Sequence, residues 1–261
     1  MRDIETNGIK KSIKKAKKTK NRIIIDIFIL VVGINIGMII GMNIGKKSKK
    51  SEETTTVSGY ESAVKEIEAR YKDGYPEGKI VMYGSSSFRF WETMEEDMAP
   101  LEVLNHGFGG ATLDDAFNYA DRLVTAFKPK AVVIYCGTND LGGMSDGTLK
   151  NAKMAYMSSV SLMEYINEQL PKTKVIYVAS SPQPLRMHKW DEEHKCNELM
   201  KEYCDGNDYC YYIDTEDALL DENGNYYEEY YLDDGIHFSE EGYIVWGKKL
   251  KEEITKIVGE K

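Results

Sequence analysis

The sequence has 261 residues, 42% of them hydrophobic, which is enough to bury one sizeable core. The formal charge of −9 is unevenly distributed, because residues 1–50 carry a net charge of +10 and the rest of the chain carries −19. A nucleic-acid-binding protein would carry its basic face on the folded part, so this distribution argues against nucleic acid as a partner.

The N-terminal part has the pattern of a membrane anchor. Residues 23–45 form an apolar run, roughly 34 Å long as a helix, which is enough to cross a bilayer. Residues 1–22 are strongly basic, so the positive-inside rule predicts a cytoplasmic tail and a C-terminal body outside the cytoplasmic membrane. A cleaved signal peptide is the alternative, but its apolar region would be shorter and followed by a small-residue cleavage site. The sequence therefore predicts an uncleaved, single-pass anchor.

Four glycines recur at every fourth position of the predicted span: Gly33, Gly37, Gly41 and Gly45. Small residues at this spacing allow two membrane helices to approach closely, which predicts a homodimer through this face. Glycine is also common in membrane helices generally, so ordinary composition explains the pattern equally well. The sequence leaves both interpretations open.

The segment after the span divides into a linker and a folded part. Residues 46–56 have no apolar content and are typical of a linker. From Val57 to Tyr71, apolar residues recur at helical spacing and predict an amphipathic helix. We therefore expect a basic cytoplasmic tail (1–22), a transmembrane anchor (23–45), a linker (46–56) and a folded domain (57–261).

The folded domain alternates apolar runs with helical patterns. We predict strands at 79–83, 101–104, 131–136, 174–179 and 210–213, and helices near 88–96, 113–127, 148–169, 190–204 and 239–257. This alternation is typical of a mainly parallel sheet with helices on both faces. The sequence therefore predicts an α/β domain with three α/β/α layers, preceded by one transmembrane helix.

Three polar stretches each follow a predicted strand. Ser86 follows the first strand, Gly107–Thr112 follow the second, and Gly137–Asp140 follow the third. His237 lies in the loop before the last helix. The carboxyl ends of parallel strands share one edge of the sheet, where ligands bind in open α/β folds, so we expect these residues to converge there.

The residue types suit ester hydrolysis by a serine nucleophile. A serine hydroxyl attacks when a base takes its proton, and histidine suits that role near neutral pH. Asp234, three residues before His237, is able to turn back and orient the imidazole. The glycine-rich backbone at Gly109-Gly110 and the side-chain amide of Asn139 are suitable donors to an oxyanion.

Four blocks of the chain resemble those of the SGNH subgroup of the GDSL hydrolases, esterases named after their Ser, Gly, Asn and His residues. The blocks are Gly84-Ser85-Ser86, the loop around Gly110, Gly137-Thr138-Asn139-Asp140 and Asp234-Gly235-Ile236-His237, in the family's order over roughly residues 79–250. The resemblance implies a flavodoxin-like SGNH fold and no cofactor. It also implies a catalytic triad of Ser86, Asp234 and His237, and an oxyanion hole of Ser86, Gly110 and Asn139.

The first block departs from the family at one position, because Ser85 stands where the family has aspartate. That residue neighbours the nucleophile and is not a member of the triad. Spacing alone leaves Ser85, Ser86 and Ser87 open as the nucleophile, and the resemblance selects Ser86. The G-x-S-x-G elbow of α/β-hydrolases is absent, which argues against that fold.

Other polar residues are weaker candidates. Arg89 and Arg186 are candidates for substrate contact, and a solvated surface position explains each of them as well. No cluster of His, Cys and carboxylate residues has the spacing of a metal site, so we expect no metal. Cys204 and Cys210 are close enough across a turn for a disulfide, which the sequence leaves undecided.

Together these features predict a membrane-anchored serine esterase that hydrolyses a carboxylic ester through an acyl-Ser86 intermediate. The expected substrates are short-chain (acetyl) esters of cell-envelope carbohydrate. A lysophospholipase or lipase-type acylhydrolase and a sugar O-acyltransferase would use the same residues. A catalytically silent carbohydrate-binding module is the non-enzymatic alternative.

Overall fold

The computed structural model describes residues 59–143 and 149–259. The predicted tail, anchor and linker, with their four spaced glycines, lie outside these residues. Within the described ranges, no helix is both long enough and apolar enough to cross a membrane.

The centre of the domain is a five-stranded sheet in which every pair of neighbouring strands is parallel. The strands are β1 (Ile80–Gly84), β2 (Val103–Gly107), β3 (Ala131–Tyr135), β4 (Lys174–Val178) and β5 (Cys210–Ile213). Their spatial order is β2-β1-β3-β4-β5, which is the flavodoxin-like order. Gly84 pairs with Gly107 on one side and Tyr135 on the other, so the carboxyl ends of β1, β2 and β3 lie level at one edge.

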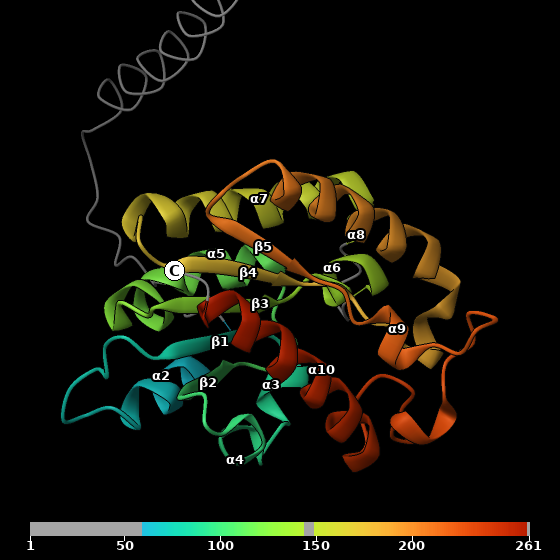
Figure 1. The fold of residues 1–261 in the computed structure, drawn as a ribbon, viewed down its shortest axis with the longest axis horizontal. Coiled ribbons are helices and arrows are strands. Elements are labelled where there is room, and N and C mark those ends of the chain that lie inside the picture. The colour runs from blue at the N-terminus through green and yellow to red at the C-terminus, as the bar shows by residue number, and fades with distance from the viewer. Residues whose placement is uncertain (1–58, 144–148, 260–261) are drawn as a thin grey trace, which may run out of the picture. The chain divides into compact units, whose positions relative to one another are not determined.

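Helices cover both faces of the sheet, giving three layers (Figure 1). One face carries α2 (Glu61–Ala69), α5 (Leu113–Leu123), α7 (Ala152–Gln169) and α8 (Trp190–Asp205). The other carries α3 (Ser86–Arg89), α4 (Met94–Met98), α9 (Glu216–Leu219) and α10 (Glu240–Gly259). Short helices α6 (Thr138–Gly142), η1 (Thr125–Phe127), η2 (Pro184–Lys189) and η3 (Glu228–Tyr230) lie in the connections. The predicted three-layer α/β architecture is therefore confirmed for the folded part.

The core consists of one apolar cluster on each face of the sheet. Strand β3 shows why its sequence is a continuous apolar run, because successive side chains point to opposite faces. Val132 and Ile134 belong to the cluster under α5 and α7. Ala131, Val133 and Tyr135 belong to the cluster under α10.

The predicted single helix near 88–96 is wrong, because the structure has two short helices there, α3 and α4. Trp91 Nε1 and Thr93 Oγ1 both donate to Asp97 Oδ2, at 2.7 and 2.6 Å, and fix the turn between these helices. Since α3 begins at Ser86, the serine opens a helix and does not stand in a loop before one.

Strand β2 extends to Gly107, beyond its predicted end at 104. The polar residues Asn105 and His106 hide the strand pattern in the sequence. His106 is fully buried, with Nδ1 2.6 Å from Leu123 O and Nε2 3.1 Å from the Tyr71 hydroxyl. Both ring nitrogens therefore have partners inside the core.

The four cysteines, Cys136, Cys196, Cys204 and Cys210, are buried free thiols in the structure. Cys204, near the end of α8, and Cys210, the first residue of β5, lie within hydrogen-bonding reach of each other. The two cysteines are thus close together, as the sequence predicts, but they do not form a disulfide in this structure.

Candidate active site

Ser86 is placed where β1 turns into α3 at the carboxyl edge of the sheet. The strand ends at Gly84, where an added Cβ would lie 2.0 Å from Tyr135 O, so only glycine fits this close approach to β3. The next residue, Ser85, is buried and donates its N–H to Tyr135 O (3.2 Å). Ser87 is also buried, whereas Ser86 is partly exposed to solvent. Of the three serines, Ser86 is therefore the one with an accessible hydroxyl.

His237 arrives from the loop before α10, inside a tight turn. An isolated bridge pairs Tyr231 with Phe238 at the base of this turn, and Gly235 adopts a φ of +63° within it. Asp234 Oδ1 accepts the backbone N–H groups of Ile236 (2.8 Å) and His237 (3.0 Å). The carboxylate thus fixes the turn that carries the imidazole.

The three polar side chains form one hydrogen-bonded chain. Asp234 Oδ2 lies 2.6 Å from His237 Nδ1, and His237 Nε2 lies 2.9 Å from Ser86 Oγ. Burial tends to raise the pKa of Asp234, but hydrogen bonds from His237 and Ile236 outweigh burial and lower the pKa below its usual range. An ionised Asp234 accepts the Nδ1 proton, which leaves Nε2 of a neutral imidazole to accept the Ser86 hydroxyl proton.

The glycine loop after β2 lies beside the loop after β3. Asn139 is buried and donates Nδ2 to Ala111 O (3.0 Å), which leaves its second amide N–H available for another acceptor. Asp140 Oδ2 accepts the N–H of Leu113 at 2.9 Å, next to the capping residue of α5. The two loops are therefore bonded to each other directly. Gly110 lies at the centre of the first of them, with a φ of +81°.

Arg186 bonds to protein groups at the edge of the site. Its guanidinium donates to Asn139 Oδ1 (3.2 Å), Gln183 Oε1 (2.9 Å) and Thr138 O (3.3 Å). Because the carboxamide oxygen accepts from Arg186 and the nitrogen donates to Ala111, both ends of the Asn139 amide are fixed. Burial lowers the pKa of Arg186, with a partly opposing effect of Glu193.

Arg89 is exposed one turn along α3 from Ser86. Its guanidinium lies over the Phe90 ring at 5.5 Å, and a Cβ added to Gly109 would meet its Nη1 at 2.8 Å. Arg89 therefore lies against the glycine loop. Phe90 packs edge-on against His237, with ring centroids 4.8 Å apart.

Sequence reasoning missed Asn105, which holds the end of α3 in place. Its Nδ2 donates to Phe88 O (2.6 Å) and its Oδ1 accepts the N–H of Gly107 (3.0 Å). In the sequence, Asn105 is a polar residue two positions before the glycine loop. This position indicates a structural role only when β2 is known to continue through Asn105.

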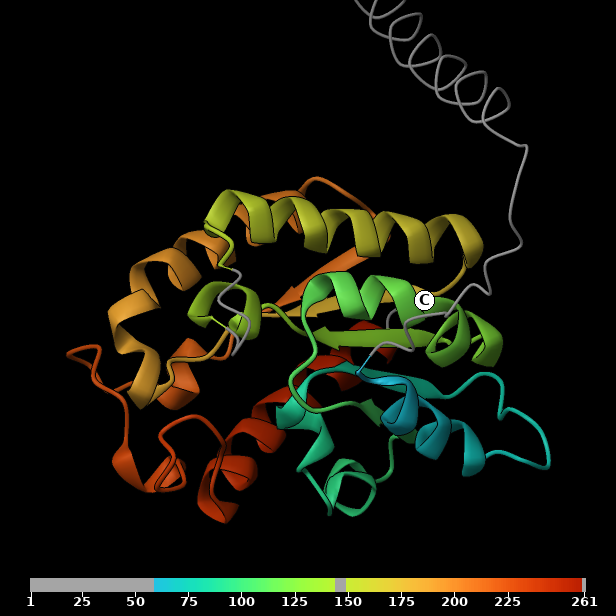
Figure 2. The ribbon, with the colours of Figure 1, turned by 180° about the vertical axis from the view of Figure 1, so that it is seen from behind.

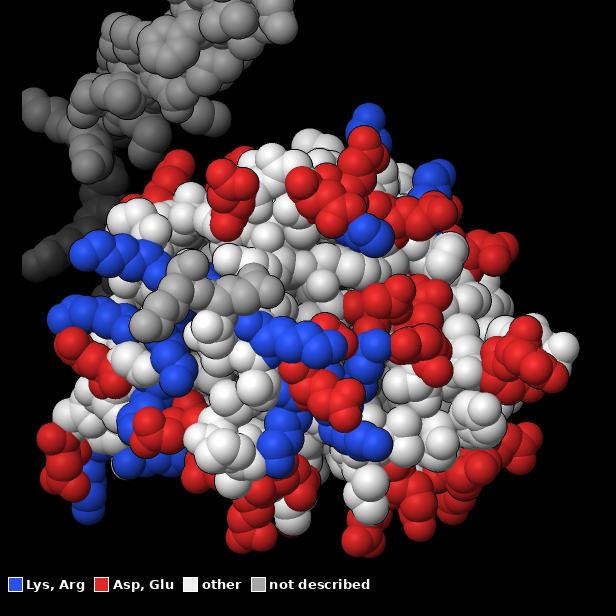
Figure 3. Space-filling view, in the orientation of Figure 1, with Lys and Arg blue, Asp and Glu red and all other residues white. Residues whose placement is uncertain are grey.

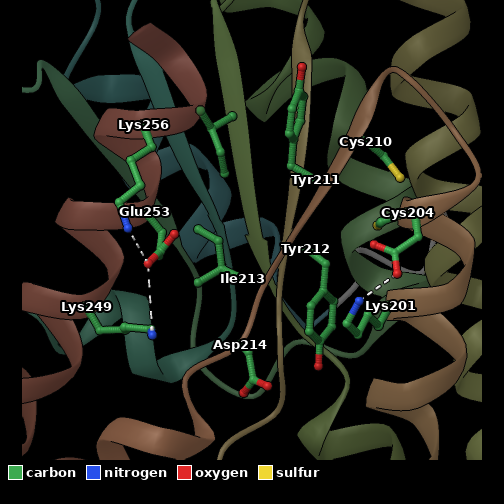
Figure 4. A pocket seen from close by; sticks show the side chains of 12 residues that line it. Lys201, Cys204, Cys210, Tyr211, Tyr212, Ile213, Asp214, Lys249, Glu253 and Lys256 are labelled. Carbon is green, nitrogen blue, oxygen red and sulfur yellow. Dashed lines mark hydrogen bonds and ion pairs between the residues drawn. The ribbon is translucent and has the colours of Figure 1, made fainter. Parts of the chain in front are cut away.

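A groove away from these residues lies along β5 between α8 and α10 (Figure 4). It has a volume of about 560 Å³ and is lined by charged and tyrosine side chains, including Lys201, Tyr212 and Lys249. Neither Ser86 nor His237 lines it. Over residues 59–143 and 149–259, no three His, Cys, Asp or Glu side chains gather as metal ligands.

Comparison with known proteins adds independent information. Residues 73–245 match the GDSL-like Lipase/Acylhydrolase family. N-acylneuraminate cytidylyltransferase from Escherichia coli O18:K1:H7 is 27% identical over 181 residues, which are 69% of this chain and only 40% of that relative. Platelet-activating factor acetylhydrolase IB subunit alpha2 from Gallus gallus is 24% identical over 200 residues, which are 72% of this chain and 80% of that relative.

A solved structure of a family 3 carbohydrate esterase from Clostridium thermocellum shares the fold. It superposes with a TM-score of 0.56 at 15% identity, over 70% of this chain and 98% of the esterase. The family match spans most of the protein and includes Ser86, Asp234 and His237. The protein therefore belongs to the GDSL-like lipase/acylhydrolase family and is a serine ester hydrolase.

Proposed function

We propose that Ser86 is the nucleophile of this hydrolase, with His237 as its general base and Asp234 as the residue that orients the base. Ser86 Oγ attacks the ester carbonyl while its proton moves to His237 Nε2. His237 then gives this proton to the departing alcohol, which leaves an acyl-Ser86 ester. A water molecule, deprotonated by the same imidazole, releases the carboxylic acid and regenerates the serine. The hydrogen-bonded chain of 2.9 and 2.6 Å carries this proposal.

We further propose that the backbone N–H groups of Ser86 and Gly110 and the amide of Asn139 bind the oxyanion. The support is the bonding of the two loops, which fixes Gly110 and Asn139 next to each other through Ala111. Removing one such donor typically costs about 10²–10³ in rate. No step of this mechanism requires a cofactor.

The proposed substrates are short-chain, acetyl-type esters of cell-envelope carbohydrate. One relative is named as an acetylhydrolase, and a structural neighbour is a carbohydrate esterase. Three tyrosines before the His237 loop are poorly placed to stack on a sugar, because Tyr231 is buried and Tyr226 and Tyr230 pack against the core.

One observation favours a lysophospholipid or other lipid ester as the second candidate. Phe90, Leu185 and Leu232 are 47%, 63% and 52% exposed. Phe90 packs on His237, Leu185 donates its N–H to Gly235 O, and Leu232 donates its N–H to His237 O. Three exposed apolar side chains thus flank the loop of the catalytic base, where an acyl chain could lie.

Acyl-chain length separates these candidates. We expect the full-length protein to hydrolyse p-nitrophenyl acetate best, with kcat/KM falling beyond about four carbons. A chain that becomes buried would gain about 0.8 kcal/mol per CH₂, or roughly fourfold in kcat/KM for each carbon. A steady rise towards the dodecanoate ester would therefore establish the lipid candidate.

The nucleophile is tested in the same assay. Ser86→Ala should abolish hydrolysis and labelling by a fluorophosphonate, whereas Ser85→Ala, at a buried position, should retain part of the activity. Wild-type turnover in Ser86→Ala would contradict the mechanism. Transfer of the acetyl group to an added sugar, in place of water, would identify an O-acyltransferase.

We propose that residues 23–45 anchor the protein in the cytoplasmic membrane with the hydrolase domain outside the cytoplasm. The sequence supports this location through the apolar run and its basic flank. The face in Figure 3 carries acidic side chains mainly along its upper, right and lower parts, and lysines and arginines mainly across its left and centre. Release of the full-length chain from membranes by sodium carbonate would refute the anchor. A homodimer through Gly33, Gly37, Gly41 and Gly45 remains part of the same proposal.

A further inference from the structure

The segment formed by Tyr60 and α2 precedes the region that matches the family, yet Tyr60 bonds to the proposed oxyanion loop. The family match begins at residue 73, and α2 ends at Ala69. Tyr60, the residue before α2, donates its hydroxyl to Gly110 O at 2.8 Å. Its ring also packs edge-on against Phe108, with centroids 5.6 Å apart. A segment outside the family match thus contacts the loop that carries Gly110.

The element that presents Tyr60 is firmly attached to the domain. Val64 and Ile67 of α2 are buried in the core beside α5, and Figure 2 shows the two helices next to each other. Arg122 of α5 donates to both carboxylate oxygens of Glu68, at 2.7 and 2.6 Å, and to Glu61 at 2.8 Å. A bidentate arginine–carboxylate pair with a third bond fixes the orientation of α2 as well as its position. The Tyr60 hydroxyl is therefore held by a rigid element.

The backbone at Gly110 needs such support. Ala111 N–H and Phe108 O close a turn at 3.4 Å, which is long for a hydrogen bond, and Gly110 takes a φ of +81° inside it. A glycine with this φ at the third position is typical of a type II turn. The peptide groups on both sides of Gly110 meet at its Cα, where glycine has the widest choice of φ and ψ. Because both peptide groups lie inside the turn closed by Ala111 N–H and Phe108 O, fixing the Gly110 carbonyl also restricts the direction of the Gly110 N–H.

We propose that Tyr60 is a positioning residue for ester hydrolysis, which orients the Gly110 N–H towards the oxyanion through its bond to the Gly110 carbonyl. This inference rests on the proposed role of Gly110 as an oxyanion donor. The second restraint on the loop, from Asn139 to Ala111 O, acts one peptide further along. Tyr60 and Asn139 together hold two consecutive carbonyl groups of the loop. The segment that follows the predicted linker is thereby part of the catalytic apparatus.

The test removes a single hydroxyl from the full-length protein. Tyr60→Phe keeps the ring on Phe108 and should lower kcat for p-nitrophenyl acetate about 5- to 20-fold, less than the loss of a whole oxyanion donor. KM should change by less than about twofold, since the ground-state ester carries no oxyanion. A boronic acid forms a tetrahedral adduct with the serine. Its dissociation constant should rise in Tyr60→Phe by the same factor by which kcat/KM falls.

Tyr71→Phe is the matched control. It removes a hydroxyl from the segment just after α2, where the bond goes to buried His106 and not to the loop. It should leave kcat and boronate affinity at wild-type values, even if the melting temperature falls. Wild-type kcat in Tyr60→Phe, or equal losses in both variants, would overturn the inference. Wild-type activity that survives Ser86→Ala would instead refute the proposed function on which the inference rests.

Discussion

In the proposed mechanism, Asn139 is oriented as an oxyanion donor before a substrate arrives. A carboxamide has two nearly equivalent orientations, and only one directs an N–H towards an oxyanion. Arg186 donates to the oxygen and Ala111 O accepts from the nitrogen, so the orientation is chosen by the protein. The sequence suggested Arg186 as a substrate contact, but its position favours an orienting role. Preorganised donors of this kind need no rearrangement in the transition state.

Substitution of Arg186 should therefore reduce turnover more than substrate binding. We expect Arg186→Met to lower kcat about 10-fold with little change in KM, because Asn139 loses the donor that fixes its orientation. Arg186→Lys should not restore the rate, since one ammonium group cannot reproduce three bonds from a planar guanidinium. Arg89→Met is the comparison, because Arg89 is an exposed arginine that lies against the neighbouring glycine loop. A higher KM with unchanged kcat in Arg186→Met would instead show that Arg186 contacts the substrate directly.

At the scale of elements, the crossing of α3 over the ends of β1 and β2 determines where Ser86 lies. Both strands end in glycine because another backbone passes close to each end. A Cβ added to Gly107 would lie 2.4 Å from Arg89 N and 2.8 Å from Phe88 Cβ. Contacts this short cannot be relieved by rotating a flexible side chain. Gly107 is thus required by the helix that carries the serine, whereas Gly84 is required by its close approach to Tyr135 of β3.

Replacing Gly107 by alanine should displace α3. We expect Gly107→Ala to destabilise the protein by about 2 kcal/mol or more, as overpacking commonly does, and to reduce activity because Ser86 moves away from His237. Thermal melting and p-nitrophenyl acetate hydrolysis measure the two effects. Gly259→Ala is the control, because a Cβ there has no atom within 4 Å and should change neither property. An active, stable Gly107→Ala protein would contradict this role of the close contact.

Local patterns allowed the sheet to be predicted well, and they failed where tertiary contacts decide. The five strands, their parallel arrangement and the edge where Ser86, Asn139 and His237 meet followed from apolar runs and strand-end motifs. The split between α3 and α4 depends on Asp97 accepting from Trp91 and Thr93, which no periodicity reveals. The bond from Tyr60 to Gly110 joins residues 50 positions apart, so a helix pattern in the sequence gives no indication of it.

At the scale of the whole molecule, two buried ionisable groups oppose each other in their effect on stability. Burial lowers the pKa of His106 to about 4, and burial raises the pKa of Glu193 to about 8 against the charge of Arg186. His106 therefore favours folding as pH rises from about 4 to 6.5, because the unfolded chain binds the extra proton there. Glu193 has the opposite sign between about 4.5 and 8, because the folded protein keeps a proton that the unfolded chain has lost.

The two effects cancel between about pH 4.5 and 6.5, and only the Glu193 effect remains above that. We therefore expect the free energy of unfolding to fall by about 2 kcal/mol between pH 6.5 and 8, which corresponds to 1.4 kcal/mol for each pH unit in that window. Glu193→Gln keeps the shape of the protonated acid and should remove this fall, so that its melting temperature stays nearly constant over the same range. Glu222→Gln, at an exposed position, should follow the wild-type profile. An equally steep fall in Glu193→Gln would show that another group loses the proton, and Glu193 would then be ionised in the folded protein at neutral pH.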